Sequence, residues 1–348
     1  MNQTLKFGLD TFGDVTVDPN GQPVHAAQVI RNIVEQAVLA DRLGIDALGV
    51  GEHHRDDFAV SAPEVVLAAI AARTERITLG TAVTVLSSDD PIRVFERFST
   101  LDAVSGGRAE ITLGRGSFIE SFPLFGYDLE DYEVLFSEKL DLFSVVRREK
   151  PFSWEGTVRP ALRNAEVFPK TETGALPTWI GVGGTPQSVV RAAQYGFGLA
   201  LAIIGGAPAR FAPLAELYRR ALEQLGQPRL PIAVHSPGFV AETDDEARDQ
   251  LFPYFKANRD RIGRERGWPP TTREDFEDDV ENGAVFAGSP ETVAQKIADT
   301  VKVLGIDRFD LKYSNGPMPH ELLMRCIELY GTEVIPRVRE LVPAPGTA

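Results

Sequence analysis

Strand-like and helix-like segments alternate along almost the whole of this chain, and this alternation limits its fold more than any other feature. Apolar runs rich in β-branched residues are followed by stretches whose apolar residues recur at helical spacing. The expected strands are 5–12, 45–51, 77–86, 108–113, 176–182, 197–204, 231–242 and 308–313. The expected helices are 26–43, 62–73, 91–104, 129–148, 186–195, 209–225, 244–262, 290–304 and 319–341. Eight such units without an internal linker predict one α/β domain over residues 1–348, a closed (β/α)8 barrel of the TIM type with insertions.

Two stretches interrupt the alternation. Residues 151–170 carry a turn at Gly156 and are expected to form a hairpin insertion. Residues 263–283 are rich in Pro, Gly, Arg and acidic residues, so they are expected to form a long loop and are the candidate for a mobile lid. An open doubly wound sheet is the alternative fold. The barrel fits better because no GxGxxG dinucleotide fingerprint follows the first strand.

Charge and cysteine content exclude several classes of function. The chain carries 36 basic and 50 acidic residues, and its formal net charge of −14 would repel nucleic acids and anionic membrane surfaces. No apolar run is long enough to span a bilayer, and the N-terminus does not resemble a signal peptide. Cys326 is the single cysteine and the histidines lack paired ligand spacing, so we expect no disulfide and no metal site. A cytoplasmic protein without nucleic-acid or membrane partners is therefore expected.

The segment 179–196, WIGVGGTPQSVVRAAQYG, joins a buried strand to an amphipathic helix. Its paired glycines let a ligand approach the backbone, and Pro186 is a typical first helical residue. The first turn of the helix offers unpaired N–H groups and the positive end of the helix dipole, which together suit a phosphate monoester. An ordinary strand-to-helix turn is the alternative. The residues that such a site would use are Val182, Gly183, Gly184, Thr185, as the expected N-cap, and Ser188.

In a barrel, chemistry gathers where strands end and helices begin, and three further segments lie there. The first is Gly51-Glu52-His53-His54 at the end of the second expected strand; if the strand persists, adjacent side chains point to opposite sides and the two histidines cannot both face one small ligand. One histidine could therefore face the mouth as a general base or hydrogen-bond donor; a loop histidine bonded to backbone carbonyls is the alternative. The second is Gly80-Thr81-Ala82, which is small enough to leave room for a flat ring, although a plain core strand would look the same. The third is Leu113-Gly114-Arg115-Gly116-Ser117, in which Arg115 lies between glycines and could bind a phosphate. The alternative is that Arg115 is an ordinary surface arginine.

In their order and spacing, these segments resemble the bacterial luciferase-like, flavin-dependent monooxygenases. The resemblance covers nearly the whole chain and implies a TIM-type barrel that binds FMN at its C-terminal mouth, usually as a dimer. The matching stretches are GEHH, RITLGTAVTVLSSDDPIRVFERFSTLDAVSGGRAEITLGRG, the FG of Phe125-Gly126, WIGVGGTPQS, AGSPE, GIDRFDLK and the terminal helix.

Carried over by position, the resemblance implies roles for individual residues. Ala82 and Val83 match the position of a non-proline cis peptide beneath the flavin ring, and His53 matches the luciferases' catalytic histidine. The residues implied for the FMN phosphate are Arg115, Ser117, Gly183, Gly184, Thr185 and Ser188, with Thr81 and Val182 as further cofactor-binding residues.

Two positions depart from the family pattern. Glu133 stands where the luciferases place a second phosphate-binding arginine, so the anchor is expected to have one fewer cation and the FMN affinity is in question. Gly114 stands where they carry a reactive cysteine beside the flavin, so light emission is not expected.

The expected function is a two-component monooxygenase, since reduced FMN reacts with oxygen and the protein must keep the reactive product away from water. No separate nicotinamide-binding domain is visible, and the resemblance to the family implies that a separate flavin reductase supplies reduced FMN. The substrate is expected to be a small organic molecule such as an aldehyde, sulfonate or ketone, with Phe12, Phe58 and Phe118 as candidates for its pocket or for the core. A deazaflavin-dependent hydride-transfer enzyme and a flavin-binding protein without turnover are the alternatives.

Overall fold

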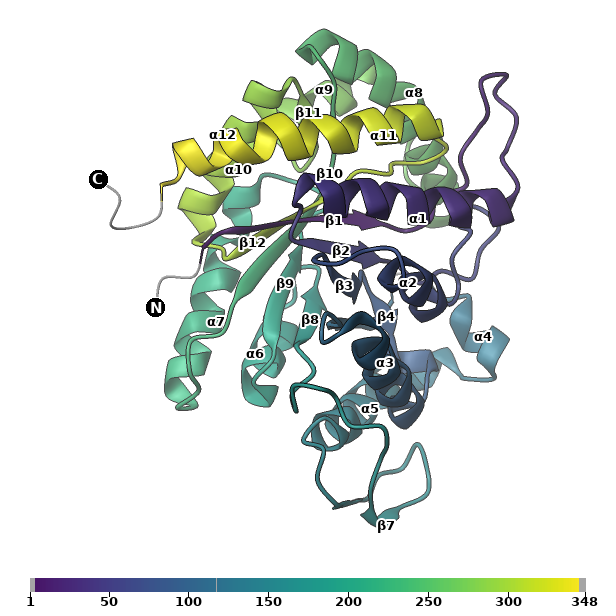
Figure 1. The fold of residues 1–348 in the computed structure, drawn as a ribbon, viewed down its shortest axis with the longest axis vertical. Helices are drawn as coiled ribbons and strands as arrows, with labels where there is room; N and C mark the ends of the chain where they lie inside the picture. Colours follow the sequence, from purple (N-terminus) through teal and green to yellow (C-terminus); the bar gives the residue numbers. More distant parts are fainter. Residues whose placement is uncertain (1–3, 117, 344–348) are drawn as a thin grey trace.

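A sheet of parallel strands curls into a nearly closed barrel with helices packed around it (Figure 1). The computed structural model describes residues 4–116 and 118–343. Around the barrel the strands follow the order β3–β2–β1–β12–β10–β9–β8–β5–β4. Their bounds are Lys6–Thr11 (β1), Ala47–Val50 (β2), Thr78–Thr81 (β3), Thr84–Val85 (β4), Ile111–Gly114 (β5), Thr178–Val182 (β8), Gly198–Ala202 (β9), Ile232–Val240 (β10) and Arg308–Lys312 (β12). The predicted (β/α)8 barrel is therefore confirmed.

The helices follow the strands in the expected alternation. Figure 1 shows α1 and α11 side by side on the outside of the barrel, although they come from opposite ends of the chain. The main helices are Ala26–Leu43 (α1), Pro63–Ala71 (α2), Pro91–Ser105 (α3), Tyr132–Val146 (α5), Pro186–Tyr195 (α6), Ala212–Gln224 (α7), Asp244–Arg266 (α8), Pro290–Leu304 (α10), His320–Leu329 (α11) and Ile335–Leu341 (α12). Among the described residues, none of the helices has both the length and the apolar character needed to cross a bilayer.

The third strand of the barrel is divided into two pieces. β3 pairs with β2, and β4 pairs with β5 through Thr84 and Leu113, so the two pieces together close the sheet. Between them lie Ala82 and Val83, whose peptide bond is cis. The expectation of one continuous strand over 77–86 is therefore wrong at these two residues.

Local sequence signals set the ends of several helices. Gly44 closes α1 in the left-handed conformation, with φ of 78°, which glycine adopts without steric cost. Asp90 caps α3, since its side chain accepts hydrogen bonds from the N–H groups of Ile92 and Arg93, and Pro91 is the first residue of the helix.

Tertiary packing changes the segment that was expected to be a long loop. α8 continues to Arg266, and a further helix, α9, spans Arg273–Glu281, so the loop prediction for 263–283 is wrong over most of its length. A capping box between Thr272 and Asp275 begins α9, and Phe276 and Val280 bury its apolar side. The helical signal in this stretch is weak because Phe276 and Val280 are the buried residues of α9.

Other short elements lie outside the expected pattern. Residues 151–170 contain an antiparallel pair, β6 (Phe152–Trp154) and β7 (Leu162–Ala165). Sequence reasoning did not anticipate the helix α4 (Ser121–Phe125), the strand β11 (Phe286–Gly288), which pairs with the end of β10, or the π-helical turn at 330–334 between α11 and α12.

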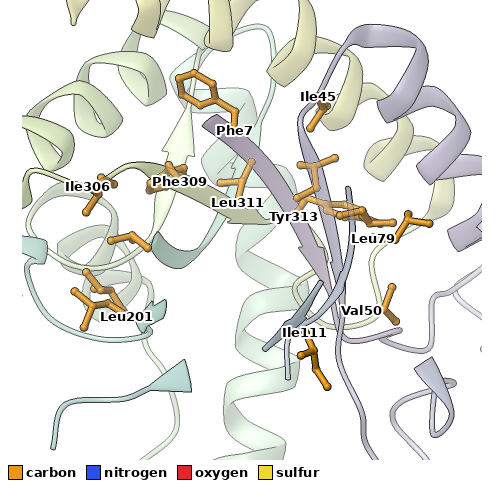
Figure 2. Close-up of a cluster of buried hydrophobic side chains, with 14 of the residues drawn as sticks. Phe7, Ile45, Val50, Leu79, Ile111, Leu201, Ile306, Phe309, Leu311 and Tyr313 are labelled. Atoms are coloured by element: carbon orange, nitrogen blue, oxygen red, sulfur yellow. The ribbon is translucent and has the colours of Figure 1, made fainter. Parts of the chain in front are cut away.

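The two faces of the sheet have different chemistry. Phe309 and Leu311 of β12 pack with Phe7 of β1 in the apolar layer between the sheet and the helices, part of which is drawn in Figure 2. Side chains alternate along a strand, so the intervening residues of β12, Arg308 and Asp310, face the barrel interior. The interior is therefore polar, and it forms the floor of the candidate site.

Candidate functional site

A buried ion-pair network fills the lower part of the barrel. Arg308 Nη1 lies 2.5 Å from Oε1 of Glu110, the residue before β5, and Arg308 Nε lies 2.6 Å from Asp310 Oδ1. Trp179 of β8 donates from Nε1 to Glu110 Oε2 at 3.1 Å. Burial raises the pKa of the Asp310 carboxyl group, while Arg308 acts in the opposite direction. These contacts cross the barrel from β12 to β5 and β8, so they fix the floor on which the mouth rests.

A second polar layer lies nearer the carboxyl ends of the strands. Asp10 Oδ2 of β1 and His235 Nδ1 of β10 are 2.5 Å apart, and the His235 ring stacks on Phe12 with 5.6 Å between ring centroids. Lys312 Nζ lies 4.6 Å from the centroid of the same phenyl ring and 3.5 Å from Asp14 Oδ2. Sequence reasoning did not select Asp10, His235 or Lys312 for this site, although each lies within an expected strand.

His53 faces an aromatic pocket at the barrel mouth. Its ring centroid is 5.0 Å from that of Phe12, 4.2 Å from that of Phe58 and 5.2 Å from that of Phe118. Burial lowers the pKa of His53 to about 3, and the positive charges of Lys312 and Arg55 act in the same direction. The imidazole is therefore neutral near pH 7, with one ring nitrogen able to donate a hydrogen bond and the other able to accept one.

His54 points to different neighbours. Its Nε2 is 2.9 Å from Glu52 Oε1, and its ring makes an edge contact with Phe125 at 4.9 Å. The prediction that the adjacent histidines face different surroundings is confirmed. Within the described ranges 4–116 and 118–343, no group of three or more His, Cys, Asp or Glu side chains could hold a metal ion.

Glycines surround the Ala82–Val83 peptide bond, which is cis, as the resemblance predicts. A Cβ atom at Gly51 would lie 3.1 Å from the Ala82 carbonyl oxygen, and a Cβ atom at Gly114 would lie 2.4 Å from Val83 Cγ2. Gly181 of β8 is equally constrained, since its Cβ atom would lie 2.9 Å from Val83 Cγ1. A glycine is therefore required at position 114, because Val83 fills the space that a side chain there would need.

Glu52 and Thr81 hold the chain on either side of this peptide bond. Glu52 Oε2 accepts a hydrogen bond from the Val85 N–H at 2.8 Å. The hydroxyl groups of Thr81 and Thr84 are 3.0 Å apart. Glu52 therefore links the histidine pair to the divided third strand.

The start of α6 forms an open turn at the mouth. Thr185 occupies the N-cap position, as predicted, but its hydroxyl makes no capping bond and instead donates to Ser188 Oγ at 2.8 Å. Gly184 has a φ of 137°, and a Cβ atom at Gly183 or Gly184 would meet nothing within 4 Å. The turn therefore has open space beside Gly183 and Gly184, while Val182 before it is buried.

Arg115 extends to the same turn. Its Nη2 donates to Ser188 Oγ at 3.4 Å, and its guanidinium lies over the Tyr132 ring. The structure thus brings Arg115 to Ser188, whose hydroxyl is also bonded to that of Thr185. Ser117, which was predicted to join them, lies outside the described residues.

A second arginine, which sequence reasoning missed, completes this cluster. Arg191 Nη2 donates to Glu133 Oε1 at 2.5 Å, and Arg115 Nη1 donates to Glu133 Oε2 at 3.1 Å. One fewer cation was expected at this anchor because Glu133 stands on α5, and the structure puts Arg191 of α6 against the same carboxylate that Arg115 contacts. The three-residue spacing from Ser188 to Arg191 puts both side chains on one face of a helix and could have revealed this.

The end of α8 covers the aromatic pocket. Arg55, two residues after His53, binds Glu265 of α8 through two hydrogen bonds of 2.8 and 2.5 Å. Arg261 of α8 pairs with Asp57 at 3.1 Å, and the Arg266 guanidinium lies 5.4 Å from the Phe118 ring centroid. Ion pairs thus fasten the last turns of α8 to the loop that follows His53.

Comparison with known sequences gives a consistent result over most of the chain. The family model described as luciferase-like monooxygenase matches residues 10–308. The 4-hydroxyprotoasukamycin monooxygenase of Streptomyces nodosus subsp. asukaensis is 26% identical over 326 residues, which cover 87% of this chain and 85% of that protein. The N-acetyl-S-alkylcysteine monooxygenase of Bacillus subtilis (strain 168) is 28% identical over 294 residues, which cover 80% and 84%.

Solved structures share the fold at lower identity. Monooxygenase RslO1 from Streptomyces bottropensis superimposes with a TM-score of 0.83 at 24% identity, over 95% of this chain and 99% of that chain. The oxygenating constituent of 3,6-diketocamphane monooxygenase from Pseudomonas putida, solved with FMN, superimposes with a TM-score of 0.76 at 19% identity, over 96% of this chain and 99% of that chain. An F420-dependent secondary alcohol dehydrogenase, solved with an F420-acetone adduct, superimposes with a TM-score of 0.76 at 18% identity, over 97% of this chain and 99% of that chain.

Proposed function

This chain belongs to the luciferase-like monooxygenase family, and within that family we propose that it is an FMN-dependent two-component monooxygenase. It would take reduced FMN from a separate flavin reductase and use oxygen to oxidise a small organic substrate of the aldehyde, sulfonate or ketone type. The named relatives are monooxygenases, which makes oxidoreductase chemistry the common ground of the family.

The start of α6 carries this proposal. A phosphate monoester needs N–H donors, positive charge and room, and this turn combines two guanidinium groups, two hydroxyls and open space in front of Gly183 and Gly184. The donor set therefore fits the FMN phosphate. Arg115, Arg191, Thr185 and Ser188 would hold it, while Ala82 and Val83 would lie beneath the ring.

Bound reduced FMN would supply the electrons that activate oxygen. The protein's own contribution would be to keep water from the reacting groups, through the apolar rings of Phe12, Phe58 and Phe118 around His53 and the ion pairs of α8 beside them. His53 would orient a reacting oxygen atom through its ring N–H and accept a proton at its other nitrogen. Its depressed pKa leaves that nitrogen unprotonated and available near pH 7.

Substrate-dependent oxygen consumption tests this proposal. The protein is supplied with FMN that a separate reductase or light keeps reduced, together with a panel of aldehydes, sulfonates and ketones. Incorporation of one atom of labelled oxygen into a product supports the proposal. Oxygen consumption that yields only hydrogen peroxide with every member of the panel supports the alternative of flavin binding without turnover.

A deazaflavin-dependent oxidoreductase is the second candidate, favoured by the structural likeness to the F420-dependent dehydrogenase. Absorbance of the reconstituted protein separates the two, because oxidised FMN absorbs at longer wavelength than oxidised deazaflavin. The second candidate would replace the first if the protein bound a deazaflavin stably and transferred hydride between it and a carbonyl or alcohol substrate, but showed neither binding nor turnover with FMN.

We further propose that the protein works as a homodimer in the cytoplasm, as the resemblance suggests. Sedimentation of the purified protein at micromolar concentration tests the oligomeric state. A monomer that is active at the same concentration would contradict the dimer.

A further inference from the structure

The Glu133 carboxylate occupies the space between the two arginines at the start of α6. Its two oxygens take different partners, since Oε1 accepts from Arg191 at 2.5 Å and Oε2 accepts from Arg115 at 3.1 Å. Ser137, one turn further along α5, also donates to Oε1 at 3.2 Å. The carboxylate thus engages the same guanidinium groups that would hold a phosphate.

A carboxylate and a phosphate are alternative ligands for such a pair of arginines. Guanidinium groups bind both through the same planar arrangement of N–H donors. Two positive charges and one negative charge leave this cluster with a single net positive charge while Glu133 is in place. An incoming phosphate dianion would meet a half-neutralised anchor and a neighbouring negative charge.

The exposure of the three side chains indicates which one can move. Glu133 is 57% exposed and lies in the first turn of α5, whereas Arg191 is 19% exposed and packs over the Phe136 ring. Arg115 is 30% exposed and lies over the Tyr132 ring. The arginines are therefore held by aromatic neighbours, while the glutamate can rotate into solvent.

The charge of Glu133 is secure near neutral pH. Burial acts to raise its pKa, but the hydrogen bond from Arg191 and the positive charges of Arg191 and Arg115 outweigh this and leave the pKa below its ordinary value. The competition is therefore between two anions at every pH where the protein would work.

We propose that Glu133 is a built-in competitor for the cofactor phosphate, which holds Arg115 and Arg191 in the free protein and must release them when a phosphate monoester binds. This inference rests on the proposed function and adds to it the manner of binding. The glutamate weakens FMN binding, so that the flavin exchanges with a diffusible pool and behaves as a co-substrate rather than as a permanently bound group. Its effect is confined to ligands that carry the phosphate.

Glu133→Gln tests this exchange role, because glutamine keeps the shape and removes the charge. FMN and riboflavin are titrated separately into the wild-type protein and the variant at moderate ionic strength, and binding is followed by flavin fluorescence. We expect Glu133→Gln to bind FMN about tenfold more tightly, the effect of removing one partly screened charge beside a phosphate, and to release it more slowly. Riboflavin affinity should be unchanged. Glu223→Gln, an exposed glutamate on α7, is the matched control for net charge and should leave both affinities unchanged.

The outcomes separate this inference from the proposed function. FMN that binds wild type and Glu133→Gln equally, or binds the variant more weakly, overturns the competitor role while leaving the FMN-dependent function intact. An equal increase in the affinity for riboflavin also overturns the competitor role, because riboflavin has no phosphate and the effect would then not act through that group. If neither protein binds FMN at millimolar concentration, both proposals fall. Glu133→Ala provides a second variant, and circular dichroism checks that each variant is folded.

Discussion

Replacing Gly114 with alanine would force a side chain into the space that Val83 fills. The new Cβ atom would lie 2.4 Å from Val83 Cγ2 and 3.1 Å from Val83 Cβ. Non-bonded carbon atoms are ordinarily about 3.5–4.0 Å apart, so either β5 or the divided third strand must shift. Overpacking of this kind lowers the free energy of unfolding by about 1–3 kcal/mol.

A second substitution identifies the cause of that loss. Val83→Ala removes both Cγ atoms and leaves only the 3.1 Å contact, which a movement of a few tenths of an ångström relieves. The double variant should therefore be more stable than the sum of the two single effects predicts, by about 1 kcal/mol or more, as contacting residues commonly show. Gly114→Cys carries the same Cβ atom, so the cysteine of the luciferases cannot be restored here without a change at Val83.

Urea denaturation measures these free energies of unfolding, with the slope checked for each variant. Gly205→Ala is the control, because a Cβ atom there would meet nothing within 4 Å. It should remain within about 0.5 kcal/mol of wild type, as surface substitutions usually do. Strictly additive effects of Gly114→Ala and Val83→Ala, or a Gly114→Ala variant as stable as the control, would refute the packing argument.

Three further predictions address the proposed site. The pKa of His53 is about 3 in the folded protein and about 6.5 in the unfolded chain, so below pH 6.5 the unfolded chain binds a proton that the folded protein does not. The free energy of unfolding should therefore fall as the pH drops from about 6.5 toward 3. Between pH 7.5 and pH 5, His53→Gln should show a smaller fall than the wild type. An equal fall in both proteins would contradict the neutral imidazole. Arg191→Ala should lower the affinity for FMN about 10- to 100-fold in fluorescence titration and leave the affinity for riboflavin unchanged, since a charge-assisted hydrogen bond contributes about 1.5–3 kcal/mol. An unchanged FMN affinity would show that Arg191 does not bind the phosphate. Arg261→Ala loses the ion pairs with Asp56 and Asp57 and should divert more of the consumed oxygen to peroxide, measured with peroxidase, whereas unaltered coupling would show that this end of α8 does not protect the pocket.

Local patterns in the sequence were sufficient for most of the fold. The alternation of apolar runs and amphipathic stretches predicted the barrel, and the end of α1 at Gly44 and the start of α3 at Asp90 and Pro91 could be assigned because capping depends on neighbouring residues. His53 and His54 have different neighbours, as expected, although β2 ends at Val50, before either histidine. The resemblance, rather than periodicity, pointed to the peptide bond between Ala82 and Val83.

The tertiary structure alone decided which distant side chains meet. Asp10 and His235 face each other because β1 and β10 flank β12 and point their side chains into the same barrel, an arrangement that depends on strand order and register. Glu133 was expected to mark a missing cation, yet its carboxylate pairs with Arg191 of α6, and a contact between side chains of two different helices depends on where those helices lie. Sequence periodicity fixes which face of an element is buried, whereas contacts between elements depend on how those faces are brought together, and the chemistry of this site arises from the second.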